Sequence, residues 1–490
     1  MQNNTRSMKY LKDFWFKTQF PKRNPINFSR IDRFIILTIS VFTSIISSYQ
    51  LISNQVLNFE YIIPFLITFF EILACSIILI FISKKENPMI NSRQILLIIG
   101  LLLITQLLKI YFGIFLSPLA IVIPPALIIS QGMGTLTALT WVSIAFINWP
   151  SSMSDINNYI LFITFVCACI VSVLGGKIRS RAQLLQLSIF VPLAACIAQL
   201  ILIGNEYSLF NKIENLFLMP RNIFYDSLIL AIFMLTTILL MPIFEGIFGL
   251  LTKARLLELA DQEKPLLRRL SIEAPGTFEH TLLICGLAEE ATRIIGGDVD
   301  LIKTGALYHD VGKLHAPDWF IENQHGKKNP HDELNNPIES AKILQDHVNE
   351  GLKFARKHRL PKPIADFIPE HQGTLKMGYF LFKAKEKNID ISEDSFRYKG
   401  PIPQSKETAI LMLADGCEAA LRALDINASD SEAIKTITKI IKSREIDGQL
   451  KESNLSISEI YLIKRAFLNV WKRIRHRRIQ YPTTKNNTFS

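Results

Sequence analysis

Long apolar runs fill residues 34–250, and charged residues are concentrated in the rest of the chain. A membrane-spanning helix needs about 20 apolar residues. Six runs approach or exceed that length, near 34–53, 61–83, 95–116, 157–176, 182–203 and 225–250. The segment 118–148 is also apolar and fits either two short crossings or a re-entrant pair. The pattern therefore predicts a polytopic helical membrane domain over 34–250.

Basic residues mark one side of these spans. They occur in the N-terminal segment 1–33, in the loops at 84–93 and 177–181, and at 253–255, whereas the loops at 54–60 and 148–156 carry none. Because Lys and Arg are retained on the cytoplasmic side, both the N-terminus and the C-terminal half are predicted to lie inside. The number of crossings is then even: eight if 118–148 crosses twice, six if it is re-entrant. We predict eight.

Three charged residues, Glu71, Lys109 and Glu245, fall within the predicted spans. A charge in the bilayer is costly and often marks a ligand or ion path. However, Lys109 is long enough to reach the interface from its position, and Glu245 lies near the predicted cytoplasmic face. A structural role therefore fits these residues as well as a functional one.

Residues 251–490 show helical periodicity and helix caps, with no convincing alternating strand pattern. A helical linker over 251–274 is interrupted by Pro265. Pro275 and Gly276 then break the chain, and Thr277 is the expected N-cap of the next helix. The further predicted helices cover 301–313, 337–358 with Asn336 as its cap, 363–372, and 405–425 with Ser405 as its cap. The predicted class is all-α, with one domain over 275–430 and further helices and a polar tail over 431–490.

Metal-donor side chains recur on the core-facing stripes of these helices. The adjacent pair His309-Asp310 lies in an apolar run, and the further donors are His280, His347, His371 and Asp415. A single His-Asp pair is more often a hydrogen-bonded pair in a protein core than part of a metal site. A buried carboxylate is costly unless it is paired or bound to metal, so donors directed inward from five helices predict a metal centre. The remaining histidines, His315, His325, His331, His358 and His476, lie in polar surroundings and are not assigned to metal.

Charge and cysteine usage exclude two other classes. The net charge is +11, but the basic residues gather at membrane flanks and in the C-terminal tail, where anionic lipid is the simpler partner. Polymeric nucleic acid is therefore not predicted as a partner. The six cysteines show no CxxC spacing, so neither a disulfide framework nor a zinc knuckle is indicated. A reducing cytoplasm suits the C-terminal half.

Seven motifs occur in one order along the second half of the chain. They are 273–280 (EAPGTFEH), 308–313 (YHDVGK), 320–324 (FIENQ), 329–332 (NPHD), 370–374 (EHQGT), 396–401 (FRYKGP) and 403–407 (PQSKE). In this order they resemble the HD-domain metal phosphohydrolases, and more specifically the seven-transmembrane-receptor HD family, the PgpH-type cyclic-di-AMP phosphodiesterases of bacteria. The resemblance covers residues 225–425 closely and the membrane half in layout.

The resemblance implies a centre of two divalent metal ions bridged by Asp310. His280, His309 and Asp415 would complete the ligands of one ion, and His347 and His371 those of the other. Mixed nitrogen and oxygen donors suit Fe or Mn. Of these residues, His309 and Asp310 would act in catalysis with Lys313, which would also contact the substrate phosphate beside Gln372.

The function implied is hydrolysis of a cyclic dinucleotide, cyclic di-AMP, to the linear dinucleotide. The enzyme would be a multi-pass protein of the bacterial inner membrane with its HD domain in the cytoplasm and its membrane half as anchor and sensor; a homodimer is compatible with the sequence. Two alternatives stay open: hydrolysis of another nucleotide such as a guanosine tetraphosphate, and a receptor that binds nucleotide without cleaving it.

The chain departs from the family pattern in two places. Family members usually carry a large extracellular domain after the first span, where this chain has only the loop 54–60. They also commonly show His-His where this chain has His371-Gln372. The second departure falls inside the expected site and bears on the receptor alternative, since a missing metal ligand would mark a domain that binds without cleaving.

Overall fold

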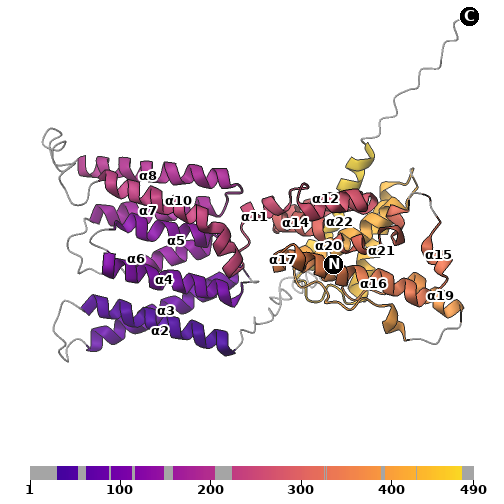
Figure 1. Ribbon diagram of the computed structural model, residues 1–490, viewed down its shortest axis with the longest axis horizontal. Coiled ribbons are helices and arrows are strands. Elements are labelled where there is room, and N and C mark those ends of the chain that lie inside the picture. The colour runs from indigo at the N-terminus through magenta and orange to yellow at the C-terminus, as the bar shows by residue number, and fades with distance from the viewer. Residues whose placement is uncertain are drawn as a thin grey trace, which may run out of the picture. The chain divides into compact units, whose positions relative to one another are not determined.

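The structure is a computed structural model, and it describes residues 30–52, 62–87, 90–112, 116–147, 158–204, 223–324, 326, 328–387, 392–425 and 427–476. The basic segment 1–29, the loops at 54–60 and 148–156, and the tail from 477 lie outside these ranges. The chain divides into two compact units after Arg255. Figure 1 shows helices in both units, and the described residues contain no extended strand beyond one isolated bridge. The all-α prediction is therefore confirmed.

The first unit is a bundle of apolar helices that lie side by side (Figure 1). The described helices are α2 (Arg30–Ile52), α3 (Ile62–Glu86), α4 (Ser92–Phe112), α5 (Pro118–Met133), α6 (Thr135–Ile147), α7 (Asn158–Gly175), α8 (Arg181–Gly204) and α10 (Ile223–Phe248). By length and composition, α3, α4, α8 and α10 are able to cross a membrane, and the others have shorter apolar segments. Many of their large apolar side chains are exposed, as expected of a surface that faces lipid rather than water.

Helices α5 and α6 form a hairpin rather than one long span. Gly134 joins them with a φ of +117°, a conformation that favours glycine. The start of α6 is fixed by the Glu86 carboxylate at the end of α3, which accepts from the Thr137 backbone at 2.6 Å. Near its other end, the Ala145 carbonyl accepts from Lys109 of α4 at 2.8 Å. Helix α6 thus reaches from the end of α3 to the last turn of α4. Because α5 and α6 are among the shorter apolar helices, a double crossing by 118–148 stays a prediction.

Two of the intramembrane charges have partners within the bundle. Lys109 is fully buried, so the expectation that it reaches the interface is wrong: the Ala145 carbonyl holds its ammonium group between helices instead. Glu245 of α10 binds Arg181 of α8 at 2.9 Å and accepts from the Thr252 hydroxyl at 2.6 Å. These contacts give Lys109 and Glu245 structural roles.

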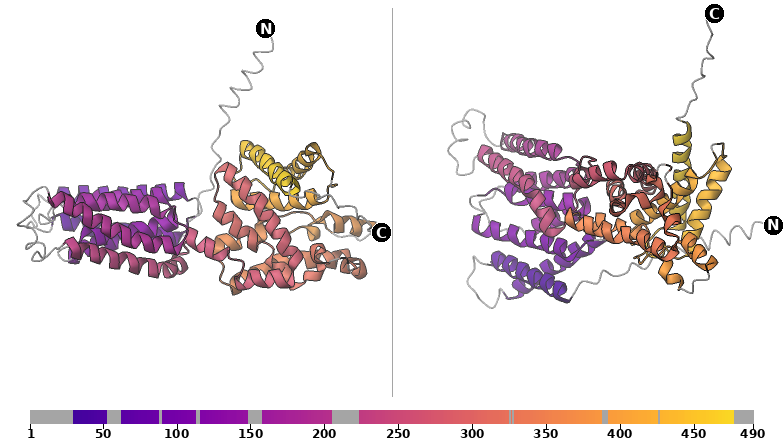
Figure 2. Two further views of the ribbon diagram at one scale, coloured as in Figure 1. Left: turned by 90° about the horizontal axis from the view of Figure 1, so that it is seen from above. Right: turned by 45° about the vertical axis from the view of Figure 1, so that its right-hand side comes forward.

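The second unit is built from helices of very different lengths, packed around a central one. They are α12 (Pro265–Glu273), α13 (Pro275–Ile295), α14 (Val299–Tyr308), α15 (Pro330–Leu334), α16 (Pro337–Lys357), α17 (Lys362–Ala365), α18 (Phe367–Glu370), α19 (Gly378–Glu386), α20 (Lys406–Arg422), α21 (Asp430–Ile446) and α22 (Ile457–His476), preceded by α11 (Lys253–Leu259). Four 3-10 turns lie among them: η3 (Val311–His315), η4 (Pro317–Trp319), η5 (Ile321–Asn323) and η6 (Glu393–Phe396). Residues 409–414 of α20 are buried, and α20 packs on α13, α14, α18, α21 and α22. Figure 2 shows the yellow C-terminal helices beside the other helices of this unit.

The caps show where local sequence decides the helix ends. The Asn336 side chain accepts from the backbone of Ile338 and Glu339, and Ser405 forms a capping box with Thr408, as predicted. Thr277 is not an N-cap, because α13 already begins at Pro275. Proline suits the first helical position, where no backbone donor is needed, so Pro275 starts the helix instead of only ending the preceding one.

Candidate metal centre

The His309-Asp310 pair lies where a helix ends, not inside one. Helix α14 stops at Tyr308, and the chain continues as the 3-10 turn η3, so the predicted continuous helix over 301–313 is interrupted. Gly312 allows this turn to lie against α16: a methyl group there would stand 1.7 Å from the His347 carbonyl oxygen. The glycine therefore brings the Asp310 segment and the His347 helix into direct contact.

Asp310 is the centre of the donor set. Its Oδ2 lies 3.3 Å from His309 Nε2, and its Oδ1 lies 3.4 Å from His371 Nε2 and 3.6 Å from His347 Nε2. Two groups of donors fall within the span of one ion each: His280, His309 and Asp310, and Asp310, His347 and His371. Asp310 belongs to both groups.

Three histidines are oriented in the same way. The Nδ1 atoms of His309, His347 and His371 face the carbonyl oxygens of Ala306, Leu344 and Phe367. A carbonyl only accepts, so each Nδ1 carries a proton, and each Nε2 is left directed at Asp310. Burial also lowers the pKa of His347 to about 3, which keeps this imidazole neutral.

The donor atoms fit a metal. His309 Nε2, His347 Nε2 and Asp310 Oδ1 are buried without a hydrogen-bond partner. Buried polar atoms are seldom left unpaired, because each costs about 1–3 kcal/mol. Burial alone would raise the pKa of Asp310, but the Lys313 ammonium group, 2.8 Å from its Oδ2, holds that pKa well below its usual value. An ionised carboxylate facing several imidazole Nε2 atoms is the arrangement that a divalent cation stabilises.

His280 and Asp415 close the other side of the centre. His280 Nε2 lies 3.1 Å from Asp415 Oδ1, and its Nδ1 lies 2.7 Å from Glu418 Oε2. Although burial disfavours the charged form, hydrogen bonds to Asp415 and Glu418 raise the pKa of His280 to about 9. A cation beside Nε2 would take the place of that proton. Glu418 is in turn bound by Arg422, whose Nε donates to Oε1 at 2.8 Å.

Lys313 and Gln372 also lie at the centre. Lys313 Nζ binds Asp310 Oδ2 at 2.8 Å and Glu322 Oε1 at 2.6 Å, and it is almost fully buried. Gln372 Nε2 lies 3.0 Å from His371 Nε2. The amide of Gln372 is therefore next to a donor atom of the second group.

Two family descriptions match separate parts of the chain. Residues 62–252 match the family described as "7TM receptor with intracellular HD hydrolase", and residues 277–420 match the HD domain. The cyclic-di-AMP phosphodiesterase PgpH of Bacillus subtilis is 34% identical over 82% of this chain and 57% of its own length. The chain belongs to the PgpH-type 7TM-HD family.

Two further proteins are similar to parts of the chain. An uncharacterized protein of Synechocystis is 44% identical over 64% of this chain and 39% of its own length. The HD domain of Listeria monocytogenes PgpH, solved in complex with cyclic-di-AMP, is 38% identical and aligns over 44% of this chain and 99% of that domain, with a TM-score of 0.42. The chain thus spans about two fifths of the length of the Synechocystis protein and about three fifths of the length of the Bacillus PgpH. Its 62–252 match contains seven described helices, from α3 to α10, with α2 before them.

The structure brings all six predicted metal donors of this HD domain together, and Lys313 and Gln372 with them. It adds three residues that the sequence did not single out: Glu322, Glu418 and Arg422. Glu418 follows Asp415 by three residues, the spacing that places two side chains on one helix face. Its position in an apolar helix could therefore have indicated that it lies near the site. Glu322 had no such signal, because it reaches Lys313 from the turn η5.

The histidines left out of the predicted site stay outside the two donor groups. His358 follows the end of α16, and His315 contacts the Gly312 carbonyl through Nδ1 at 2.8 Å. His331 is not simply solvated, since it packs between Trp319 and Phe380 and its Nε2 lies 3.0 Å from the Trp319 carbonyl oxygen. His325 and the side chain of His476 lie outside the part of the chain that the structure describes.

Proposed function

We propose that the protein is a membrane-anchored, metal-dependent phosphodiesterase that hydrolyses cyclic di-AMP to the linear dinucleotide. The observation that carries this proposal is Asp310, which belongs to two groups of metal donors at once. Two ions that share a carboxylate are a common device for hydrolysing phosphodiesters. The choice of cyclic di-AMP is supported by the name of the Bacillus relative, a cyclic-di-AMP phosphodiesterase.

Two divalent ions, Fe or Mn, suit the donors. His280, His309 and Asp415 would hold one, His347 and His371 the other, with Asp310 between them. Such ions bind phosphate oxygens and lower the pKa of water, which supplies a nucleophile near neutral pH. Imidazole ligands suit Fe and carboxylate ligands suit Mn, so a mixed set fits either metal.

Lys313 would hold both Asp310 and the substrate. Its ammonium group has three donors, and two are directed at Asp310 and Glu322. The third is available for a phosphate oxygen. The two carboxylates also raise the pKa of Lys313 despite its burial, so it keeps its charge when the anionic substrate binds.

The test is turnover by the full chain, purified in detergent and loaded with Mn or Fe. Cyclic di-AMP, cyclic di-GMP and a guanosine tetraphosphate are offered at equal concentration, and products are separated by chromatography. We expect linear di-AMP as the main product and no product after metal removal by a chelator. Preferred cleavage of the tetraphosphate would support the other nucleotide hydrolase instead.

Gln372 decides between the enzyme and a receptor that binds without cleaving. An amide oxygen binds transition metals more weakly than imidazole, whereas its NH2 donates to a phosphate oxygen. We expect Gln372→Ala to raise the KM for cyclic di-AMP about tenfold with little change in kcat, and Gln372→His to tighten metal binding at the second position. Steady-state kinetics and metal titration measure both. Activity that appears only in Gln372→His would identify the native chain as the receptor.

The HD domain would lie in the cytoplasm of a bacterium, with the bundle in the inner membrane as anchor and regulator; a homodimer stays a prediction. Lys84, Lys85 and Arg181 lie at helix ends on the predicted inner side. We expect reporter fusions at residues 179 and 260 to show a cytoplasmic location, and fusions at 57 and 152 an external one. Fusions of the two kinds serve as controls for each other, and an external signal at 179 would reverse the assignment.

A further inference from the structure

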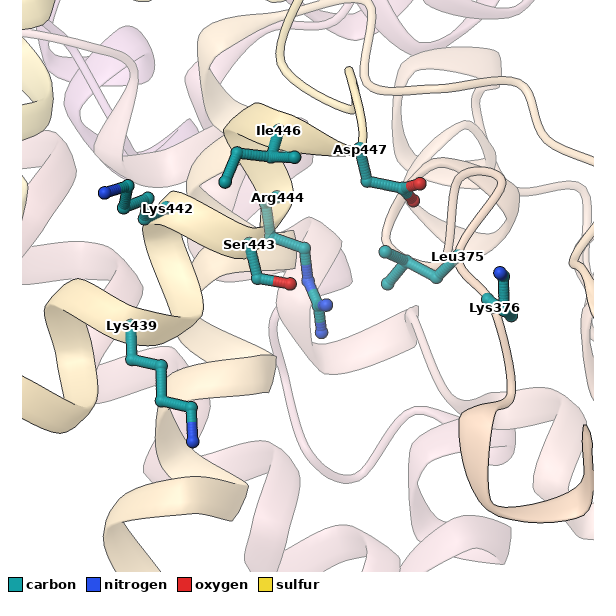
Figure 3. Close-up of a pocket in the computed structure, with 8 residues that line it drawn as sticks. All are labelled: Leu375, Lys376, Lys439, Lys442, Ser443, Arg444, Ile446 and Asp447. Atoms are coloured by element: carbon teal, nitrogen blue, oxygen red, sulfur yellow. The ribbon is translucent and has the colours of Figure 1, made fainter. Parts of the chain in front are cut away.

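A pocket of about 550 Å³ lies in the second unit, and its lining includes none of the candidate metal donors. One wall is the end of α21, and the other is the segment that follows His371 and Gln372. Its lining residues are Leu375, Lys376, Lys439, Lys442, Ser443, Arg444, Ile446 and Asp447. Figure 3 shows the side chains of Lys439 and Arg444 extending from the helix on the same side, with Leu375 and Lys376 across from Arg444.

Cations outnumber anions in this lining. Asp447 is its one carboxylate, and Arg397 binds it at 3.2 Å. Lys376 pairs with Glu393, but Lys439 has no ion-pair partner within the described part of the chain. The Nε of Arg444 is buried with no hydrogen-bond partner. This atom is covered by protein, so an anion in the pocket would contact the guanidinium group through its terminal nitrogens.

Apolar surface accompanies the charge. Leu375 lines the side opposite α21, and Ile446 is 78% exposed at the end of the helix. An exposed isoleucine beside cationic groups suits a ligand with a flat apolar part and an anionic part. The pocket volume lies in the range usual for small-molecule sites, which is large enough for a mononucleotide. Arginine binds phosphate in a fork of two donors.

Both walls are joined to segments that carry metal donors. The Leu375 backbone N–H donates to the Gln372 carbonyl at 3.1 Å. Arg444 lies against Gly416, where a methyl group would stand 3.2 Å from Nη2, and Gly416 follows Asp415. A ligand in this pocket would therefore touch two segments that shape the centre while leaving the donors themselves free.

We propose that this pocket binds the phosphate of a nucleotide, with Arg444 and Lys439 holding the phosphate and Leu375 and Ile446 contacting the base or ribose. It is a site additional to the metal centre, and it does not depend on the reaction that the centre performs. Lys442 adds to the positive potential around it.

The test uses AMP as the probe and the full chain in detergent, treated with EDTA so that no metal is present. Saturable binding is measured by equilibrium dialysis. We expect Arg444→Gln to weaken AMP binding about tenfold or more and Lys439→Gln several-fold, because each removes a charge-assisted hydrogen bond. Arg444→Lys, which keeps the charge but loses the fork, should lie between the native chain and Arg444→Gln.

Two controls separate this site from others. Lys435→Gln removes the same charge one turn earlier in α21, outside the lining, and should leave AMP affinity unchanged. Asp310→Ala breaks the metal centre and should also leave it unchanged; a loss there would place AMP in the centre and overturn the proposal. Vesicles of phosphatidylglycerol are the other source of phosphate. If the vesicles bind the chain through Arg444 while AMP does not bind, the site recognises lipid headgroups and the nucleotide proposal is wrong.

Discussion

Replacing Asp310 with alanine is expected to remove both metal ions and to lower hydrolysis of cyclic di-AMP by at least about a thousandfold. Asp310 is the one residue that both donor groups share, so its loss leaves each ion with an incomplete set. The other residues of the centre would keep their places, because His309, His347 and His371 are each fixed through Nδ1 by a backbone carbonyl.

Elemental analysis of the purified variant, together with its turnover, measures this effect. Asp318→Ala is the matched control, because it removes an exposed carboxylate from the neighbouring turn η4. We expect the control to retain native metal content and rate. Circular dichroism should show native helix content in both variants, since the buried face of α20 is unchanged. An Asp310→Ala chain that still held two ions would show that the carboxylate is not shared.

The inward direction of the candidate metal donors could be predicted from the sequence because helical spacing is a local property. His347, His371 and Asp415 each lie on a stripe with apolar residues, and a stripe of that kind faces a core. The structure confirms that all three are at least largely buried. The same periodicity did not show that the helix ends before His309, since the break depends on the contact of Gly312 with α16. That contact joins residues 35 positions apart.

Partners of the donors were harder to predict than the donors. Glu322 and Arg422 are charged residues in segments that the sequence presents as ordinary turns and helix ends, and charged residues are usually solvated. Only the fold shows that Glu322 reaches Lys313 and that Arg422 reaches Glu418.

In the membrane bundle, too, the partner of a charged residue could not be predicted from the sequence. Lys109 near a helix end suggested a side chain at the interface, but the position of α6 beside it gives the ammonium group an acceptor inside the bundle.

Replacing Glu418 with glutamine is expected to weaken metal binding about 10- to 100-fold. Glu418 does not touch the metal position; it accepts from Nδ1 of His280 at 2.7 Å and so directs Nε2 toward Asp415 and the centre. Its negative charge also makes the imidazole a stronger ligand. Glutamine has the same shape and still accepts one bond from Arg422, but it lacks the charge. Glu418 is thus a positioning residue.

The pH dependence of metal affinity separates this role from simple damage. In the native chain the pKa of His280 is raised to about 9, so a metal must displace a proton below that pH, and its affinity should rise with pH up to about 9. Without the charge of Glu418 the pKa of His280 falls toward its usual value, and the rise should end at lower pH. Mn titrations between pH 6 and 10 measure both affinity and slope. Glu290 lies on the same helix as His280 and forms a surface ion pair with Arg473. Glu290→Gln should therefore follow the native curve. A Glu418→Gln chain with weaker affinity but the native pH slope would show that Glu418 only supports the fold.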